Sequence, residues 1–233
     1  MKMNKMKHED LRINRSALEQ QLIPNTNIFF VHIPKNAGTT FMKEVLDRQI
    51  ATHATADHIN SIEDYKEHKN VLFCRDPLRR FVSVYLWRLR KDDIVQSLSL
   101  EEVVERLDST HIIQATETGF ETDPEKLNRM FLKQVTWMNE NTEFVGRTEN
   151  FKKDIKALHR LYGVEYPAYF RNALYPAPRH NMAKGRGDQP YPTRRKLIEI
   201  LKQSAILRNK FFDYYADDYK TFGYQEPHEI QKR

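Results

Sequence analysis

Two short apolar runs in the first third of the chain each lead into a helical pattern. The first, residues 27–33 (NIFFVHI), is rich in β-forming side chains and predicts a buried strand that ends at Pro34. Beyond a short loop, Phe41, Met42 and Val45 recur at helical spacing. The pattern therefore predicts a strand, a tight loop and a helix in succession.

The second apolar run, residues 70–75, is followed by signals for the start of another helix. Asp76 is a favourable N-cap residue, and Pro77 suits the first helical turn. The apolar face of this helix recurs every three or four positions, at Leu78, Phe81, Val82, Tyr85, Leu86 and Leu89. Two consecutive strand–helix units predict an α/β fold, with a P-loop-like parallel β-sheet flanked by helices and right-handed crossovers.

The middle of the chain interrupts this alternation. Helical patterns near residues 99–107 and 127–137 predict a mostly helical insertion over about residues 92–142. Residues 143–147 then predict a third strand, and residues 148–162 predict its helix. The insertion thus separates the second and third strand–helix units.

The length of 233 residues fits one domain with a single core. We expect a polar N-terminal segment over residues 1–26, one domain over residues 27–224 and a polar tail over residues 225–233. Within the domain, a Pro/Gly/basic stretch at 171–193 predicts a loop that leads into a helix at about 194–209. One domain of this size predicts one active site.

The composition argues against a membrane-embedded or disulfide-stabilised protein. Hydrophobic residues make up 39% and charged residues 30%, and no stretch approaches the roughly 20 apolar residues that span a bilayer. The N-terminus lacks the apolar region of a signal peptide, and the single cysteine, Cys74, cannot form an internal disulfide or a cysteine-based zinc cluster. We therefore expect a cytoplasmic protein without stable membrane insertion.

The net charge of +6 is concentrated in one segment. Residues 171–210 contain ten Lys or Arg and two acidic residues, so the rest of the chain is close to neutral. Such a segment suits an anionic cofactor, an acidic polysaccharide, nucleic acid or a lipid surface, and also an ordinary solvated basic helix. Charge alone does not decide among these.

The loop after the first strand has the chemistry of a phosphate-binding cradle. Backbone N–H groups at a helix start form an anion site, and Gly38 lets a phosphate approach the backbone. Thr39 and Thr40 add hydroxyl donors, and Lys35 adds a positive charge. The sequence G-x-x-x-x-G-K-[ST] of nucleotide triphosphatases is absent, so an ordinary strand-to-helix turn is an alternative.

A second candidate anion site follows the second strand. Arg75 ends the strand, and Ser83 lies two helical turns beyond the N-cap, on the flank of the apolar face. In open α/β sheets, ligands bind at the carboxyl ends of the strands, where these two side chains would bracket a phosphate. A surface arginine and an incidental serine are the simpler alternative.

Together, the two loops resemble the motifs of a known enzyme family. HIPKNAGTT resembles the 5′-phosphosulfate loop of sulfotransferases that use 3′-phosphoadenosine 5′-phosphosulfate (PAPS), usually written H-I-P-K-T-A-G-T-S. RDPLRRFVSVY resembles their 3′-phosphate motif, R-[DN]-P-x-x-R-x-x-S-x-Y. The resemblance covers roughly residues 27–224 and is greatest to bacterial-type members of the carbohydrate sulfotransferases related to the heparan and chondroitin enzymes. One departure is Asn36, where the family usually has Thr.

The resemblance implies transfer of a sulfuryl group from PAPS to a hydroxyl of a carbohydrate or glycoconjugate acceptor. The transfer would be an in-line attack with a general base and no metal, and it would leave 3′-phosphoadenosine 5′-phosphate (PAP). Lys35 would neutralise the bridging oxygen as the S–O bond breaks, and HNMAKGRG resembles a loop that closes over the donor. The implied donor-binding residues are Lys35, Asn36, Ala37, Gly38, Thr39, Thr40, Arg75, Ser83, Lys184, Gly185 and Arg186.

The reaction requires a group that takes the proton of the acceptor hydroxyl, and the resemblance points to the segment THATADHI. His53 matches the position where related bacterial sequences have a histidine, and an imidazole titrates near neutrality. His58 is the alternative base, and His32, within the first strand, is interpreted as structural. Arg147 and Glu149 also match a family pattern, for which a structural ion pair is at least as good an interpretation as substrate contact.

Two other functions are left open by the sequence. A P-loop-type kinase shares the strand–loop–helix arrangement, although the chain lacks Gly-Lys-Ser/Thr and an obvious magnesium-binding acid after a strand. A noncatalytic protein would instead bind an anionic polymer through residues 171–210. For the enzyme we expect no nucleic-acid partner, and the sequence does not determine the acceptor or the oligomeric state.

Overall fold

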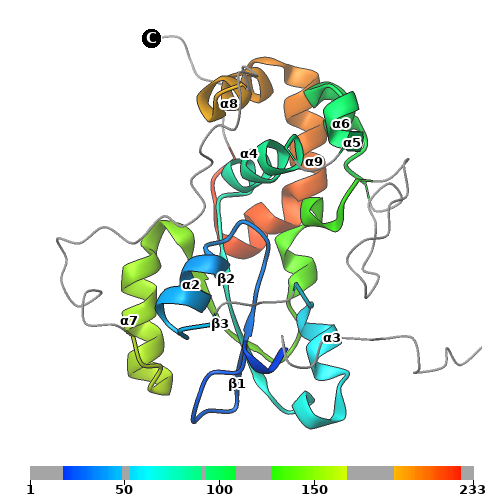
Figure 1. Cartoon of the computed structure of the whole chain (residues 1–233). Coiled ribbons are helices and arrows are strands. Elements are labelled where there is room, and N and C mark those ends of the chain that lie inside the picture. Colours follow the sequence, from blue (N-terminus) through cyan, green and yellow to red (C-terminus); the bar gives the residue numbers. More distant parts are fainter. Residues whose placement is uncertain (1–17, 49–52, 91–92, 109–126, 167–191, 227–233) are drawn as a thin grey trace, which may run out of the picture.

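A three-stranded parallel sheet lies at the centre of the computed structural model of the chain (Figure 1). The strands are β1 (Ile28–Val31), β2 (Lys69–Cys74) and β3 (Thr142–Arg147), and β2 lies between the other two. Both strand pairs are parallel, which confirms the sheet predicted from the sequence. The structure describes residues 18–48, 53–90, 93–108, 127–166 and 192–226.

Helices surround this sheet, as the sequence predicted. The α-helices of the described segments are α2 (Gly38–Glu44), α3 (Ala56–Asn60), α4 (Pro77–Arg88), α5 (Asp93–Ser97), α6 (Leu100–Glu105), α7 (Phe151–Tyr162), α8 (Arg194–Gln203) and α9 (Ala205–Phe222). Short 3-10 helices are η1 (Glu63–Tyr65), η2 (Arg129–Phe131), η3 (Gln134–Trp137) and η4 (Thr148–Asn150). The α/β class is therefore confirmed.

Aromatic residues fill the face of the sheet that α2 and α7 cover (Figure 1). Phe30 of β1 packs against Phe41 of α2 with 4.2 Å between the ring centroids. Phe73 of β2 packs against Phe151 of α7 at 4.8 Å. Because burial of such rings is a main source of stability, this packing holds α2 beside the strand that precedes it.

The opposite face of the sheet packs against α3 and against residues that precede β1. Phe29 and Leu72 share an apolar cluster there with Trp137. Leu18 is fully buried in the same cluster, and Leu22 forms an antiparallel bridge with Phe29. Part of the segment expected to be a polar N-terminus thus packs on the sheet.

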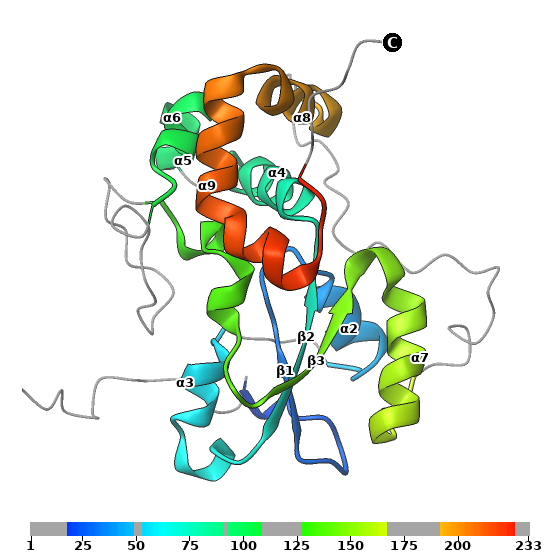
Figure 2. The ribbon, with the colours of Figure 1, turned by 180° about the vertical axis from the view of Figure 1, so that it is seen from behind.

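The helices α4, α5, α6, α8 and α9 form a second layer beyond the carboxyl ends of the strands (Figure 2). Their shared core includes Phe81, Phe211 and Tyr215. As the sequence predicts, α4 begins at Pro77, and the side chain of Asp76 accepts a hydrogen bond from a first-turn N–H group. The loops that follow β1 and β2 therefore lie between the sheet and this helical layer.

Two predicted helices differ in the structure. Residues 127–137 form η2 and η3 instead of one helix, because the carboxylate of Asp218 accepts the backbone N–H of Gln134 and fixes the start of a separate turn. The helix predicted at 194–209 is divided at Ser204, whose side chain caps α9. Both differences arise where a polar side chain replaces a helical hydrogen bond.

Candidate active site

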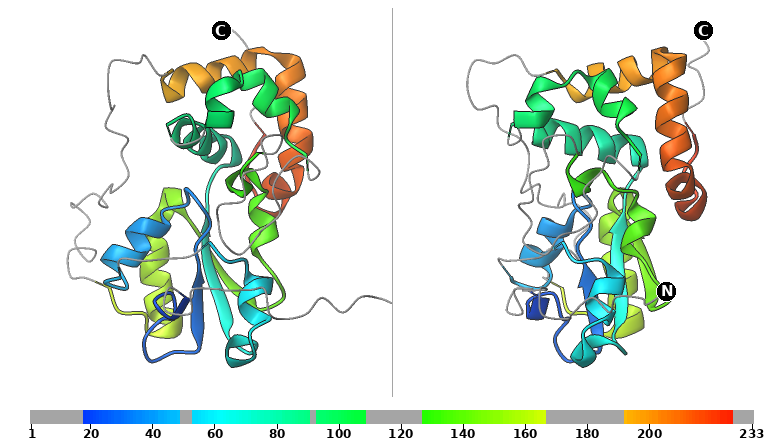
Figure 3. Two further views of the ribbon diagram at one scale, coloured as in Figure 1. Left: turned by 45° about the vertical axis from the view of Figure 1, so that its right-hand side comes forward. Right: turned by 90° about the vertical axis from the view of Figure 1, so that its right-hand side faces the viewer.

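The two loops predicted to bind anions lie next to each other, at the carboxyl ends of the paired strands β1 and β2 (Figure 3). The guanidinium of Arg75 donates a hydrogen bond from Nη1 to the backbone carbonyl of Lys35 at 3.3 Å. The side chain of Asn36 crosses from the first loop to β2 and donates to the carbonyl of Phe73 at 2.8 Å. The fold thus brings the two sequence motifs together.

The first loop has an unusual backbone. Lys35 has φ 68° and Ala37 has φ 60°, a left-handed conformation that residues with a Cβ adopt at a cost of about 1 kcal/mol or more. Asn36 between them is not left-handed. The backbone N–H of Asn36 donates to the carbonyl of Ile33 at 3.3 Å, which closes the turn at the start of the loop. The loop therefore stores strain where the sequence predicts a phosphate cradle.

Gly38 has a packing role that the sequence did not reveal. A Cβ atom at this position would lie only 1.7 Å from Cδ2 of His32. His32 is buried and stacks on Phe30, with 5.9 Å between the ring centroids. The structure supports the structural interpretation of His32, because its imidazole occupies the space that a larger residue at position 38 would need.

The ammonium group of Lys35 lies over an aromatic ring. Its Nζ is 4.4 Å from the ring centroid of Trp87, which is on α4 and 36% exposed. Burial, together with the positive charges of Arg194, Arg75 and Arg90, lowers the pKa of Lys35 to about 8. A cation surrounded by other cations in this way makes the binding of an anion favourable.

Three of these neighbours, Trp87, Arg194 and Arg90, were not predicted individually from the sequence. Trp87 falls on the polar flank of an amphipathic helix, so no sequence signal distinguishes it from a surface aromatic residue. Arg194 at the start of α8 belongs to the basic segment 171–210, and the positive charge of that segment was the signal available for predicting a cation here. Burial and Arg194 also lower the pKa of Arg75. The basic segment therefore contributes positive charge to both loops.

Ser83 lies on α4 and is 5% exposed. It occupies the same helix as Trp87, one turn earlier, and Arg75 lies just before the N-cap of that helix. Arg75 thus follows the last residue of β2, so the strand ends one position earlier than predicted, and Ser83 lies in the second turn of α4 as the sequence predicted. Their proposed contact with a phosphate stays a prediction.

The side chain of Asn36 is directed into the protein. It is 1% exposed and donates to Gln134 Oε1 at 2.6 Å as well as to Phe73. The structure gives Asn36 the role of anchoring the loop, which the sequence did not predict. A direct contact between Asn36 and the donor stays a prediction.

The geometry of His53 determines its tautomer. Its Nδ1 is 2.9 Å from the backbone oxygen of His32, and a carbonyl oxygen only accepts, so Nδ1 carries the proton and Nε2 keeps a free lone pair. Burial, with smaller contributions from Arg129, Arg80 and Lys35, lowers the pKa of His53 to about 4. The imidazole is therefore neutral at pH 7, the form that a base requires, although burial takes its pKa below the near-neutral value expected from the sequence.

The alternative base, His58, lies on α3. Its backbone N–H donates to Thr55 Oγ1, the N-cap of that short helix. Burial and the charge of Arg129 lower the pKa of the His58 side chain. Unlike His53, it has no hydrogen bond in the described part of the chain that would fix its tautomer for base catalysis.

Arg147 and Glu149 at the end of β3 both contact Tyr224. The guanidinium of Arg147 lies 4.9 Å above the tyrosine ring and donates to the carbonyl of Phe222. Glu149 accepts from the hydroxyl of Tyr224 at 2.9 Å and from the N–H of Asp76 at 3.1 Å. These contacts tie the end of α9 to the loop after β2, which is a structural role, but among the described residues Arg147 and Glu149 do not form the expected ion pair with each other.

Arg80 is a buried residue of the same region that the sequence analysis did not single out. It is 1% exposed and donates to the carbonyls of Pro34, Met130 and Leu132 at 2.8–3.2 Å. Arginine on an amphipathic helix ordinarily indicates the surface, but this position is the second Arg of the pattern R-[DN]-P-x-x-R-x-x-S-x-Y. That pattern was the signal available for finding it.

Three of the predicted donor-binding residues, Lys184, Gly185 and Arg186, lie outside the described residues. Within the described residues, no three or more His, Cys, Asp or Glu side chains are grouped so that they could hold a metal ion. The metal-free reaction expected from the sequence stays a prediction.

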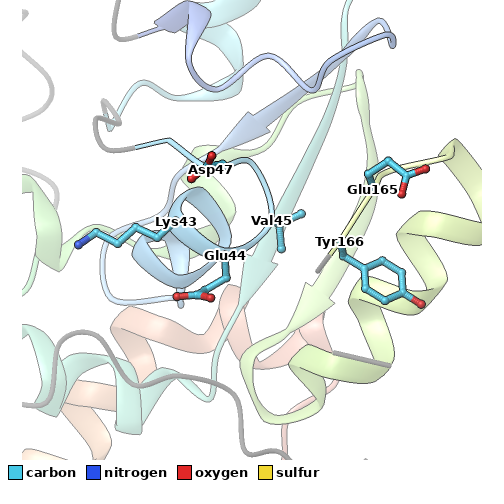
Figure 4. Close-up of a pocket in the computed structure, with 6 residues that line it drawn as sticks. All are labelled: Lys43, Glu44, Val45, Asp47, Glu165 and Tyr166. Carbon is cyan, nitrogen blue, oxygen red and sulfur yellow. The ribbon is translucent and has the colours of Figure 1, made fainter. Parts of the chain in front are cut away.

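An open cavity of about 370 Å³ lies at the other end of α2 (Figure 4). Its lining combines acidic and basic side chains with one aromatic ring, namely Lys43, Glu44, Val45, Asp47, Glu165 and Tyr166. Lys35 and Arg75 are not among them. This cavity is therefore separate from the two loops predicted to bind anions, and we do not assign it to the same chemistry.

Comparison with known proteins agrees with this geometry. The model of a family described as the sulfotransferase family matches residues 22–225, which is most of the chain and includes both loops. Neither the curated proteins nor the solved structures gave a match to the chain.

None of the helices in the described segments combines the length and the apolar character that a membrane crossing requires.

Proposed function

The chain belongs to the sulfotransferase family, and on that premise we propose that it transfers a sulfuryl group from PAPS to a hydroxyl of a carbohydrate or glycoconjugate acceptor. The observation that carries the proposal is the contact of Arg75 with the strained loop at Lys35. PAPS has an anionic group at each end of its ribose, and two adjacent cationic loops fit a ligand of that kind.

The described residues supply donors for both ends of PAPS. The backbone N–H groups near Gly38 at the start of α2, the hydroxyls of Thr39 and Thr40 and the ammonium of Lys35 would hold the 5′-phosphosulfate. Arg75 and Ser83 would hold the 3′-phosphate. The lowered pKa of Lys35 supports this assignment, because a bound anion would offset the repulsion from the arginines around it. The segment 184–186 remains part of the proposed donor site.

PAPS, when bound, would supply a sulfuryl group whose bond to the phosphate oxygen breaks as the acceptor oxygen bonds to sulfur. His53 would take the proton of the acceptor hydroxyl on Nε2, the nitrogen left free by its hydrogen bond to His32. Lys35 would stabilise the negative charge that remains on the phosphate oxygen. The proposal requires positioning and charge stabilisation, and no metal.

A cytoplasmic setting is also part of the proposal. Cys74 is the single cysteine of the chain and is free, which agrees with a reducing compartment, and burial raises its pKa to about 11, so its thiol is poorly reactive. The acceptor is proposed as a carbohydrate because the sequence resembles carbohydrate sulfotransferases most. The two loops themselves would serve any hydroxyl acceptor.

Incubation of the whole protein with PAPS labelled in its sulfuryl group, together with a panel of acceptors, tests the proposal. The panel should include oligosaccharides, acidic polysaccharides, a glycolipid and a small alcohol. We expect label on a carbohydrate hydroxyl and release of PAP. Transfer from γ-labelled ATP in place of PAPS would indicate a kinase. Binding of anionic polymers that weakens with salt, without any binding of PAP, would indicate a noncatalytic protein.

A further inference from the structure

A buried carboxamide connects the two anion-binding loops. Gln134, the first residue of η3, is fully buried. Its Oε1 accepts hydrogen bonds from the backbone N–H of Arg75 at 2.9 Å and from Asn36 Nδ2 at 2.6 Å. One oxygen atom therefore contacts both the loop that contains Lys35 and the loop that begins at Arg75.

Gln134 makes two hydrogen bonds with the backbone of Arg75. While Gln134 Oε1 accepts from the backbone N–H of Arg75, Gln134 Nε2 donates to its carbonyl at 2.9 Å. A neighbouring strand offers the same pair of donor and acceptor to a residue in a sheet. Since β2 ends at Cys74, the carboxamide continues the hydrogen-bonded pattern by one residue and fixes the backbone of Arg75.

Asp218 of α9 fixes the orientation of this carboxamide. Its Oδ2 accepts from the backbone N–H of Gln134 at 2.9 Å and from Nε2 at 3.2 Å, and its Oδ1 accepts from Val135 N–H at 3.0 Å. A carboxylate only accepts, so Nε2 must face Asp218 and Oε1 must face the two loops. Asp218 itself is fully buried.

We propose that Gln134 is a positioning residue that fixes the spacing between the two anion-binding loops, so that the protein selects a nucleotide with a phosphate on each side of the ribose. The inference rests on the proposed function. Two linked contacts bind a two-ended ligand more tightly than either contact does alone, provided that the span between them matches the ligand. A ligand with one phosphate gains nothing from that spacing.

The test compares PAP with adenosine 5′-monophosphate (AMP) by calorimetric titration of the full chain. Gln134→Met keeps the side-chain length and removes the amide. We expect it to weaken PAP binding by about tenfold or more and AMP binding by less than about threefold. Asp218→Asn is a milder second variant, because an amide nitrogen replaces one of the two carboxylate oxygens that accept from Gln134 and Val135. It should reduce the ratio of the two affinities in the same direction.

Asn70→Leu is the matched control. Asn70 is also a fully buried amide on β2, but it lies at the opposite end of the strand and donates to Asn60 and Asn139. Its loss should lower the unfolding temperature as the Gln134 substitution does, while the ratio of PAP to AMP affinity stays at the wild-type value. This comparison separates loop spacing from general stability.

Two results would overturn the inference in distinguishable ways. If the wild type prefers PAP and both the Gln134 and Asp218 variants keep that preference, only the role of Gln134 is wrong. If the wild type binds PAP and AMP equally, the proposed donor site fails, and the inference fails with it.

Discussion

The imidazole Nδ1 of His53 lies 2.9 Å from the main-chain oxygen of His32, and the two rings are 4.5 Å apart between centroids. His53, which donates this hydrogen bond to the residue that follows β1, is therefore also the candidate base. Its second nitrogen is left unprotonated by this contact. Because His32 is the residue whose ring packs on Gly38, the candidate base is tied to the first residue of α2.

Replacement of His53 tests its role as the base. His53→Ala should lower the transfer rate by about 100-fold or more, because general-base catalysis contributes 10²- to 10⁴-fold. PAP binding and the unfolding temperature should change little by comparison. His58→Ala is the control and should keep most of the activity. An inactive His58 variant beside an active His53 variant would transfer the role to His58, and two active variants would exclude both.

The pH dependence of kcat/KM follows from two lowered pKa values. Activity should fall as pH drops through about 4, where His53 becomes protonated, and as pH rises through about 8, where Lys35 loses its proton. Lys35→Arg keeps its charge, so its basic limb should move to higher pH. The profile of each protein is the measurement. An acidic limb near pH 6.5 would show a base that is not buried, and would contradict the assignment to His53.

Lys35→Ala separates binding from catalysis. The ammonium group acts on charge that develops as the S–O bond breaks, so its loss should lower kcat by about 100-fold and weaken PAP binding much less. Steady-state rates at saturating PAPS give kcat, and calorimetric titration gives the affinity for PAP. Normal turnover at saturating donor combined with weak binding would make Lys35 a simple binding residue.

Gly38→Ala should destabilise the fold, because the added Cβ would lie 1.7 Å from His32. We expect a loss of about 1–3 kcal/mol in the free energy of unfolding, typical of overpacking. In a His32→Ala background the same substitution should cost less, since the ring is gone. Denaturant unfolding of the wild type, the two single variants and the double variant gives the coupling free energy between positions 32 and 38. Additive effects would mean that the two side chains do not clash.

The sequence predicts the elements whose signals are local. The runs at β1 and β2 and the Asp76–Pro77 start of α4 are each determined by residues close together in the chain, and all three are confirmed. The positions of the candidate phosphate-binding residues follow from these elements, because parallel strands end at one edge of the sheet.

Features that depend on distant residues were not predicted. Gln134 and Asp218 are 84 positions apart, and their contact decides both the 3-10 turn at η3 and the link between the loops. The contact of Lys35 with Trp87 likewise arises only when β1 and α4 are packed together. No periodic pattern in the chain encodes either pair, since each depends on tertiary packing.

The affinity of the protein for PAP relative to AMP tests the two-loop donor site most directly, with Arg75→Ala measured beside the wild type. The account predicts that the wild type binds PAP at least about tenfold more tightly than AMP. Arg75→Ala should lose about 2 kcal/mol of PAP affinity, because one charge-assisted phosphate contact is removed, and clearly less AMP affinity, because the lost hydrogen bond to the Lys35 carbonyl affects both ligands. Arg160→Ala, an exposed position on α7 with the same change in charge, should leave both affinities unchanged. Equal binding of PAP and AMP by the wild type, or an equal loss of both in Arg75→Ala, would contradict a separate 3′-phosphate site.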